Sequence, residues 1–376
     1  MGYTEKLPNG RWKATYRAPD SRERSKTFDR KIDAQNFLTG VEGSKLRGDW
    51  IDPALGATRL EEWLPKWLAT VRPALKPSTA AGYASLIRSR IIPGLGRARI
   101  GALRPSDVQA WVSAMQTDGL STSRIRKAHV VLAAALDAAV ADSLISRNPA
   151  RGVRLPRPER REAAYFEPAV VNDIAEAMGE YRLLILVLGR LGPRFGEAAA
   201  LRRRSVDLLR RRLRIERSIT EVEGRLVEGT TKGHAQRTVP IPAGLASELE
   251  EHLADTVRPA PDAWLFPAPE GGPLRYRNFE GRMWTPTLRR LGLPHAGIHV
   301  LRHSAASVLI SAGGSPKAVQ AILGHSSAAF TLTVYGHMFD ADMDALATRL
   351  DEVSRGVPRP VRGLQRSEDS PADRRQ

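Results

Sequence analysis

A charged, proline-containing segment near the middle of the chain limits what it can fold into, because no hydrophobic core can run through it. The segment is Leu155-Pro156-Arg157-Pro158-Glu159-Arg160-Arg161, and such a composition favours an extended, exposed linker. With 376 residues, the chain is long enough for two or three domains. The sequence therefore predicts a multidomain protein with separate cores on the two sides of this linker.

Residues 1–50 are predicted to form a small domain with a three-stranded sheet and one helix. Alternating stretches at 11–17 and 25–28, separated by a turn, indicate strands, and an apolar stripe from Lys31 to Arg47 indicates a helix. The strands carry Arg and Lys beside aromatic residues. A sheet that reads DNA could use such a pattern, and an ordinary amphipathic domain of this size would look much the same.

From Leu60 onward the apolar residues recur at helical spacing. The first stripe consists of Leu60, Trp63, Leu64, Trp67, Leu68 and Val71. Three more such stripes follow, and Asn148-Pro149 ends the pattern. Residues 59–155 are therefore predicted to form a bundle of four helices, and we interpret their aromatic and aliphatic stripes as its core.

Residues 156–355 are predicted to form the largest domain, with mixed α and β structure. A leucine-rich helix around 183–188 precedes strands predicted at 213–219 and 237–241. The segment 229–234, rich in Gly and Thr, is predicted to be a hairpin turn or loop between them. The predicted fold class is thus multidomain and mainly α, with small β elements.

The end of the chain carries one more apolar stripe, formed by Met343, Leu346, Leu350 and Val353. This stripe predicts a helix at 340–354. Residues 356–376 contain Pro, Arg and Ser but few apolar residues, so they are predicted to be a disordered tail.

The charge of the chain indicates a polyanionic partner. Lys and Arg number 58 against 41 Asp and Glu, a net charge of +17, which favours nucleic acid first and an anionic membrane surface second. Residues 51–155 hold 15 basic and 7 acidic side chains, nearly half of the excess, and a basic face there would lie against phosphates. Abundant Arg from GC-rich coding would give a similar excess without such a face.

The composition excludes several classes of site. Without cysteine, the chain can form no disulfide, thiolate nucleophile, iron–sulfur centre or Cys-ligated zinc site. No stretch approaches the roughly 20 apolar residues of a membrane span, and the first residues lack the apolar core of a signal peptide. We therefore expect a cytoplasmic, nucleoid-associated protein with no membrane partner.

Four fragments of the third domain place polar side chains beside glycine or among apolar residues. They are Gly192-Pro193-Arg194-Phe195-Gly196-Glu197, Thr231-Lys232-Gly233, His299-Val300-Leu301-Arg302-His303, and Leu323-Gly324-His325-Ser326-Ser327 with Tyr335 after it. Positioned cations can stabilise the charge that builds on phosphate oxygens during phosphoryl transfer. A tyrosine hydroxyl needs a cation or a base nearby to act as a nucleophile. The set therefore suits transesterification through a phosphotyrosine.

These four fragments, called boxes below and numbered in chain order, resemble the motifs of the tyrosine recombinases, the phage-integrase family, and follow the same order. The resemblance covers almost the whole chain. The resemblance implies that Arg194 and Arg302 bind the scissile phosphate of DNA and that Tyr335 attacks it to give a 3′-phosphotyrosyl link. Because that link keeps the bond energy, the resemblance implies no need for ATP, a metal ion or another cofactor. The implied function is site-specific DNA recombination through a Holliday junction.

The resemblance also assigns the remaining boxes. It implies that Lys232 protonates the leaving 5′ oxygen, and that His299 and His325 assist in acid–base chemistry and phosphate contacts. Glu197 is expected to support the architecture of the site. His303 is interpreted as a packing or supporting residue.

By the same resemblance, residues 1–50 would be an arm-type DNA-binding domain, 59–155 the helical core-binding, SAM-like domain, and 156–355 the catalytic domain. The helix at 340–354 resembles an element that family members donate to a neighbouring subunit, although its stripe would look identical if it folded back on its own domain. The implied partners are double-stranded attachment-site DNA, a homotetramer on synapsed DNA, a DNA-bending accessory protein and an excision factor. An arm-type domain favours an integrase of a phage or other mobile element over a chromosome-dimer resolvase.

Two other functions fit the same sequence. A DNA-binding architectural or regulatory protein derived from a recombinase could keep the boxes without cutting DNA, and a resolvase that only excises would differ in its partners. The run Arg202-Arg203-Arg204 is a further candidate DNA contact. Covalent attachment to DNA would separate the recombinase from the architectural protein.

Overall fold

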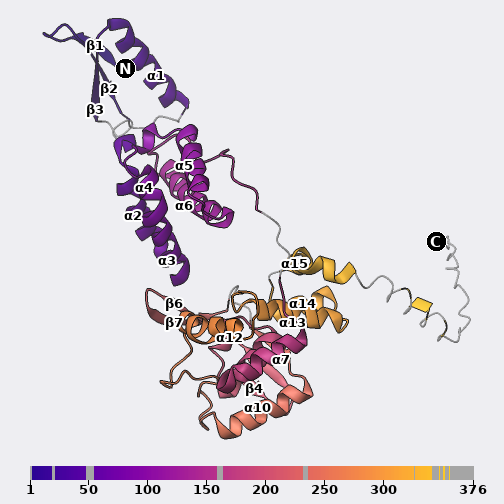
Figure 1. Ribbon diagram of the computed structural model, residues 1–376. Coiled ribbons are helices and arrows are strands. Elements are labelled where there is room, and N and C mark those ends of the chain that lie inside the picture. The colour runs from indigo at the N-terminus through magenta and orange to yellow at the C-terminus, as the bar shows by residue number, and fades with distance from the viewer. Residues whose placement is uncertain are drawn as a thin grey trace, which may run out of the picture. The chain divides into compact units, whose positions relative to one another are not determined.

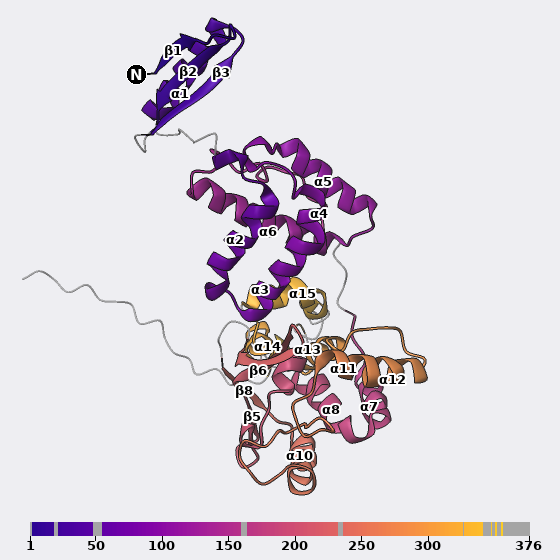
Figure 2. The same ribbon diagram turned by 90° about the vertical axis from the view of Figure 1, so that its left-hand side faces the viewer.

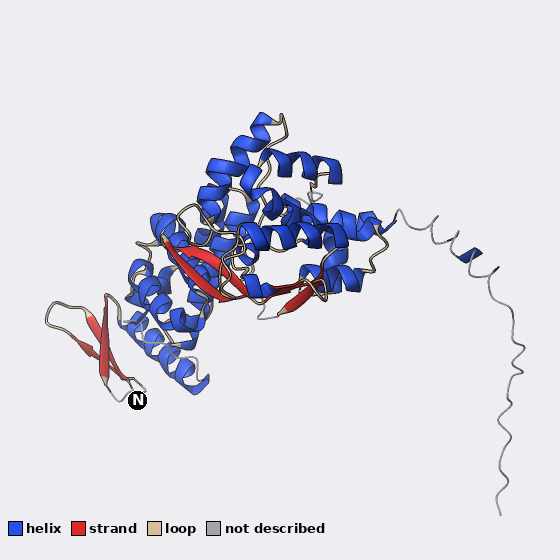
Figure 3. Cartoon of the chain, turned by 90° about the horizontal axis from the view of Figure 1, so that it is seen from below, coloured by secondary structure: helices blue, strands red, loops and turns tan. Residues whose placement is uncertain are grey.

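The computed structural model contains two compact units, which are described separately. Unit 1 comprises Met1–Arg161 with Glu221–Arg225, and unit 2 comprises Glu162–Thr220 with Leu226–Gln376. The described residues are 2–18, 22–47, 55–158, 164–231, 236–325, 327–340, 347, 350, 351 and 355. The predicted tail and most of the predicted helix at 340–354 lie outside them. Helices dominate the described part of the chain, and its strands form small sheets (Figure 3).

The first part of unit 1 is an antiparallel sheet with one helix packed against it (Figure 1). The strands lie in the order β1 Tyr3–Lys6, β2 Trp12–Arg17 and β3 Glu23–Phe28, and α1 Lys31–Arg47 contacts all three. Their shared core consists of Ala14, Tyr16, Ala34, Leu38 and Val41. The predicted three-stranded sheet with one helix is confirmed.

The second part of unit 1 is a helical bundle (Figure 2). Its helices are α2 Leu60–Val71, α3 Pro77–Leu86, α4 Ile92–Leu95, α5 Pro105–Thr117 and α6 Thr122–Ala141, with 3₁₀ turns at Leu55–Ala57, Arg72–Ala74 and Ile100–Ala102. A wide π turn at Ile87–Ile91 joins α3 to α4 just before Pro93, which lacks the amide that a regular helix would use. The four predicted helices are confirmed if α3, the π turn and α4, which follow one another without a break, are counted as one. The helices share a core that includes Leu64, Trp111 and Leu136.

Unit 2 is built around one helix that is apolar on nearly every side. Its helices are α7 Pro168–Ala177, α8 Arg182–Leu191, α9 Phe195–Ala198, α10 Ala243–Asp255, α11 Tyr276–Phe279, α12 Thr285–Arg290, α13 Val300–Ser311, α14 Pro316–Leu323 and α15 Ala328–Asp340, with tight or wide turns at Gly179–Tyr181, Arg203–Ser205 and Glu280–Trp284. α8 contacts both α7 and α13, and all its residues from Leu183 to Gly189 are buried. Such a helix is stable only inside a core, so α8 is held in place by its neighbours. The first box begins at Gly192, directly after α8, and its position is therefore set by this helix.

The described strands after residue 205 form a three-stranded sheet and a separate hairpin, whose residues 221–225 belong to unit 1. In the sheet, β5 Arg212–Ile215 lies between β4 Val206–Asp207 and β8 Arg237–Pro240 and is antiparallel to both. The hairpin pairs β6 Arg217–Val222 with β7 Arg225–Thr230. The single strand predicted at 213–219 is therefore divided between β5 and β6.

The prediction of a hairpin turn at 229–234 is wrong for its first two residues. Gly229 and Thr230 belong to β7, and the turn of the hairpin is formed by Glu223 and Gly224. Both turn residues have positive φ, 49° and 78°, as the favoured two-residue hairpin turns require. Because glutamate rarely adopts this conformation, the sequence did not indicate the turn. Residues 232–235 lie outside the described residues.

The burial of α8 predicts a large cost for shortening one of its side chains. Leu184 is 0% exposed, so Leu184→Ala should lower the free energy of unfolding by about 2–5 kcal/mol through the cavity that it leaves. Leu209→Ala is the control, since Leu209 is 97% exposed and should change the free energy by less than about 0.5 kcal/mol. Urea denaturation measures both, and equal losses would contradict the assignment of α8 to the core.

Candidate active site

The first box begins at the glycine that ends α8. Gly192 has φ +68°, a left-handed conformation that favours glycine. A Cβ on Gly192 would lie 2.5 Å from Cδ2 of Leu323 and 3.1 Å from Cβ of Ala305, so the neighbouring helices also leave no room for a side chain. The chain then runs extended through Arg194, which is the N-cap residue of α9. The backbone of Arg194 is thereby held between two helices.

A buried carboxylate holds the Arg194 side chain. The backbone amide of Arg194 donates to Oε2 of Glu197 at 3.0 Å, and Nη1 of its guanidinium donates to Oε1 at 2.8 Å. Glu197 is 1% exposed. Because a buried carboxylate is stable only when it is paired and hydrogen-bonded, this contact both satisfies Glu197 and orients Arg194.

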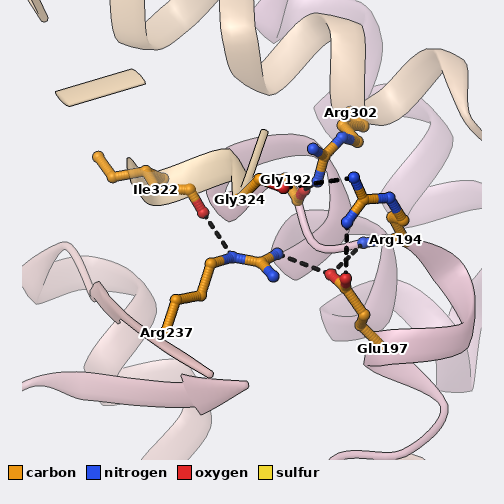
Figure 4. Close-up of polar contacts among 7 residues, drawn as sticks. All are labelled: Gly192, Arg194, Glu197, Arg237, Arg302, Ile322 and Gly324. Atoms are coloured by element: carbon orange, nitrogen blue, oxygen red, sulfur yellow. Dashed lines mark hydrogen bonds and ion pairs between the residues drawn. The ribbon is translucent and has the colours of Figure 1, made fainter. Parts of the chain in front are cut away.

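A second arginine, Arg237 of β8, also binds the Glu197 carboxylate (Figure 4). Its Nη2 donates to Oε2 of Glu197 at 2.6 Å, and its Nε donates to the carbonyl oxygen of Ile322 at 2.8 Å. A Cβ on Gly324 would lie 2.9 Å from Nη1 of Arg237, so the loop after α14 also needs glycine for this approach. Arg237 thus connects the first box to the loop that carries His325.

The sequence contains a signal for Arg237 outside the four boxes. Arg237, Val239 and Ile241 alternate along one strand, and the last two are buried. An arginine in register with buried residues therefore has its stem on the inner face of the sheet, where its charge requires a partner.

The two arginines keep Glu197 ionised. Burial alone would raise the pKa of Glu197, but the hydrogen bond and charge of Arg237, together with the backbone amide and charge of Arg194, outweigh burial and hold the pKa below its ordinary value. A negative charge therefore sits beneath the cationic groups of the site.

Arg302 of α13 is the most deeply buried cation of the site, at 3% exposure. Its Nη1 donates to the carbonyl oxygen of Gly192 at 2.8 Å, whereas its Nη2 has no hydrogen-bond partner among the described residues. Burial, and next the charge of Arg194, lowers the pKa of Arg302 to about 9. Arg302 and Arg194 lie close together in Figure 4, so the site presents two adjacent guanidiniums. In one of them, Nη2 of Arg302 is a buried donor without a partner among the described residues.

The phenol of Tyr335 lies among histidines. Tyr335 is on α15 and is 1% exposed, and its hydroxyl oxygen lies at hydrogen-bond distance, 2.7 Å, from Nδ1 of His303. The His325 ring stacks on the Tyr335 ring with centroids 6.2 Å apart, and Nδ1 of His325 lies 2.9 Å from Oγ1 of Thr331. His299, the N-cap residue of α13, meets the His303 ring edge-on at 5.2 Å.

The surroundings keep the histidines neutral and the phenol protonated at neutral pH. Burial, followed by neighbouring positive groups, lowers the pKa of His325 to about 4, with Arg302 as the largest of these groups. Partial burial, and next the nearby His303 and Arg302, lower the pKa of His299 to about 4, although the residue as a whole is exposed. Burial raises the pKa of Tyr335 to about 12, against the opposing charge of Arg302.

The structure gathers five of the six predicted site residues in unit 2: Arg194, His299, Arg302, His325 and Tyr335. The sixth, Lys232, lies outside the described residues. His303 was interpreted as a packing or supporting residue, yet it hydrogen-bonds directly to the Tyr335 hydroxyl. Its position next to Arg302 was visible in the sequence, but only the packing of α15 against α13 reveals its partner.

The arginine run at 202–204 is used largely inside unit 2. Arg202 lies over the Trp264 ring and pairs with Glu228 at 3.0 Å, and Arg203 donates to the carbonyl oxygens of Leu253 and Val257. These contacts orient both side chains within the domain, and a DNA contact by this run stays a prediction.

Two classes of feature are absent from the described residues. They contain no group of three or more His, Asp or Glu side chains that could hold a metal ion. Within the same residues, no helix is both long enough and apolar enough to span a bilayer.

Comparison with known protein families gives matches along most of the chain. The phage integrase family matches residues 165–342, the N-terminal SAM-like domain of phage integrases matches 59–116, and the N-terminal domain of phage integrases matches 1–47. An integrase of prophage phiRv2 from Mycobacterium tuberculosis is 30% identical, over 94% of this chain and 96% of the relative.

Solved structures share the fold. The Tn1549 transposon integrase in complex with a circular intermediate DNA has a TM-score of 0.68 and 22% identity, covering 78% of this chain and 99% of that one. A lambda integrase tetramer bound to a Holliday junction has a TM-score of 0.57 and 18% identity, covering 86% of this chain and 95% of that one.

The Glu197 contacts predict that loss of Arg237 destabilises unit 2. Arg237→Met should lower the free energy of unfolding by about 3–5 kcal/mol, because it leaves a buried carboxylate with one partner instead of two. Arg217→Met is the matched control, since Arg217 pairs with Glu228 at a largely exposed position. Its loss should lower the free energy of unfolding by less than about 1 kcal/mol. Urea denaturation gives both values, and similar small losses would contradict a structural role for Arg237.

The depressed pKa of Glu197 predicts a pH-dependent contribution to stability. A group whose pKa is lower in the folded state stabilises the fold above its ordinary pKa, here 4.5, and loses that contribution as the pH falls through the folded value. The difference in free energy of unfolding between the wild type and Glu197→Gln should therefore be largest at neutral pH and shrink below pH 4.5. Urea denaturation across this range tests it, and a constant difference would show that the charge of Glu197 is not what stabilises the site.

Proposed function

Since the chain belongs to the phage integrase family of tyrosine recombinases, we propose that its buried arginines bind the scissile phosphate of duplex DNA and that Tyr335 attacks this phosphate. The protein is a site-specific DNA recombinase. The observation that carries the proposal for the site is Nη2 of Arg302, a buried donor without a partner among the described residues, next to Arg194. A phosphate oxygen is the kind of acceptor that two adjacent guanidiniums fit.

The arrangement of charge supports phosphoryl transfer. Negative charge grows on the phosphate oxygens as the nucleophile attacks, and fixed donors in a buried site stabilise it more strongly than water does. Arg194 and Arg302 supply positive charge, and both are held by contacts within the protein before any substrate arrives. Little reorganisation is then needed when the transition state forms.

The remaining site residues supply hydrogen bonds to the phosphate and a proton for the leaving group. His299 and His325 are neutral at neutral pH, so they act as hydrogen-bond partners of phosphate oxygens rather than as additional charges. The leaving 5′ oxygen needs a proton, and we assign its delivery to Lys232 by analogy with the family. Cleavage then leaves a 3′-phosphotyrosyl link and a 5′-hydroxyl.

Tyr335 is packed within the catalytic domain of its own chain. It shares a small core with Ile310, Val319 and Leu323, from α13 and α14. This packing supports attack within the same subunit. Because the phenol is 1% exposed, a phosphate can reach the hydroxyl only after groups that cover the phenol move aside.

The other domains supply binding and assembly in this proposal. Residues 1–50 act as the arm-type DNA-binding domain, 59–155 as the core-binding domain and 156–355 as the catalytic domain. Four copies assemble on synapsed attachment sites and exchange strands through a Holliday junction; the lambda integrase tetramer supports this by fold similarity. A DNA-bending protein and an excision factor are candidate partners.

The proposal predicts a covalent protein–DNA adduct. Nicked suicide DNA, carrying the sequences that flank the element encoding the protein, should become linked through its 3′ phosphate to the wild type in EDTA and without ATP. Tyr335→Phe should form no adduct, because it lacks the nucleophilic oxygen, while Tyr165→Phe, at a partly exposed tyrosine, should react normally. Denaturing gels and mass spectrometry detect the linked peptide. Tight binding by the wild type without an adduct would support the architectural alternative instead.

A further inference from the structure

The hydroxyl of Tyr335 makes its hydrogen bond to a histidine outside the predicted set. Nδ1 of His303 lies 2.7 Å from the Tyr335 oxygen, within the range required for proton transfer. His325 instead lies face to face with the phenol ring, and its Nδ1 lies beside Thr331. His299 approaches the edge of the His303 ring rather than the phenol.

We propose that His303 is the general base that accepts the Tyr335 proton during DNA cleavage and returns it during rejoining. This inference rests on the proposed function, since it assigns a proton acceptor to the same nucleophile. His303 is then a catalytic residue, because its ring touches the reacting oxygen.

Cleavage and rejoining each form one bond to phosphorus, break one, and transfer two protons. In cleavage, the bond from phosphorus to the Tyr335 oxygen forms and the bond from phosphorus to the 5′ oxygen breaks. The Tyr335 proton moves to Nδ1 of His303, and a separate acid, proposed as Lys232, protonates the 5′ oxygen. In rejoining, the bond from phosphorus to the 5′ oxygen forms and the bond from phosphorus to the Tyr335 oxygen breaks. The proton of the 5′-hydroxyl returns to Lys232, and the His303 imidazolium returns its proton to the Tyr335 oxygen.

The phenol needs such an acceptor. Burial raises the pKa of Tyr335 to about 12. At pH 7 only about one phenol in 10⁵ would then be ionised, so the reaction cannot depend on spontaneous ionisation. A neighbouring base removes this limit because it takes the proton as the new bond forms.

The surroundings of His303 prepare it as an acceptor. Burial, and then the charge of Arg302, lowers the pKa of His303, so the ring is neutral at neutral pH. The proposal assigns it the tautomer with hydrogen on Nε2, in which the Nδ1 lone pair accepts from the Tyr335 hydroxyl. Among the described residues, the titratable and charged groups recorded around it are His299 and Arg302 at the start of its own helix, Tyr335 from α15, and His325 from the loop between α14 and α15. Because none of these is an anion, the arriving phosphate brings negative charge that favours the imidazolium. Proton transfer is thereby linked to the presence of substrate.

The central test separates proton transfer from hydrogen bonding. His303→Asn keeps an acceptor near the position of Nδ1 but cannot take up a proton. In single-turnover cleavage of the suicide DNA it should react at least about 100-fold more slowly than the wild type. His295→Asn is the control at an exposed histidine outside the site and should cleave at the wild-type rate. Cleavage by His303→Asn within about threefold of the wild type would overturn the proposal.

A second measurement excludes a merely structural effect. In a Tyr335→Phe background, DNA with a 3′ p-nitrophenyl phosphate is joined to a 5′-hydroxyl strand, and p-nitrophenolate leaves without needing a proton. Adding His303→Asn to this background should leave the joining rate unchanged, because the proton that His303 handles is no longer required. An equal loss in both reactions would show that His303 only shapes the site. If the wild type itself forms no adduct, the proposed function fails rather than the role of His303.

Discussion

The buried carboxylate of Glu197 is the interaction on which the rest of the site depends. Arg194 and Arg237 both bind it, and they come from two parts of the chain that are far apart in sequence. Arg237 also binds the Ile322 carbonyl, so the first box, β8 and the loop before His325 are held as one piece. Without an anion at their centre, the cations would repel one another within a buried space, and the position of Arg194 would not be fixed.

The same burial that makes this network necessary also sets the chemistry. Arg302 keeps its charge but leaves one donor without a partner among the described residues, so the fold places a cation where a phosphate oxygen can replace lost solvation. The histidines lose their charge in this setting, which makes them acceptors and hydrogen-bond partners. Burial also suppresses ionisation of Tyr335, so in the proposed mechanism this nucleophile needs a base.

Local patterns in the sequence predicted much of the fold, and spatial contacts explain what they missed. The stripe at Leu60–Val71 could be read directly, because its period follows from helix geometry. The turn at Glu223-Gly224 was missed, because glutamate seldom adopts positive φ. The boxes identified the residues that surround Tyr335, yet Arg237 and His303 gain their roles from partners 40 and 32 residues away, which a local motif cannot show.

In the proposed mechanism, Arg302 acts by stabilising negative charge on the scissile phosphate. The most direct test compares Arg302→Met with the wild type on two substrates, a normal phosphodiester and a neutral methylphosphonate at the cleavage position. On the phosphodiester, loss of Arg302 should slow cleavage by about 100-fold or more. On the methylphosphonate, which carries one charge fewer, the same substitution should have little effect. An equal loss on both substrates would contradict the claim, because it would mean that Arg302 maintains the shape of the site rather than balancing the charge of the phosphate.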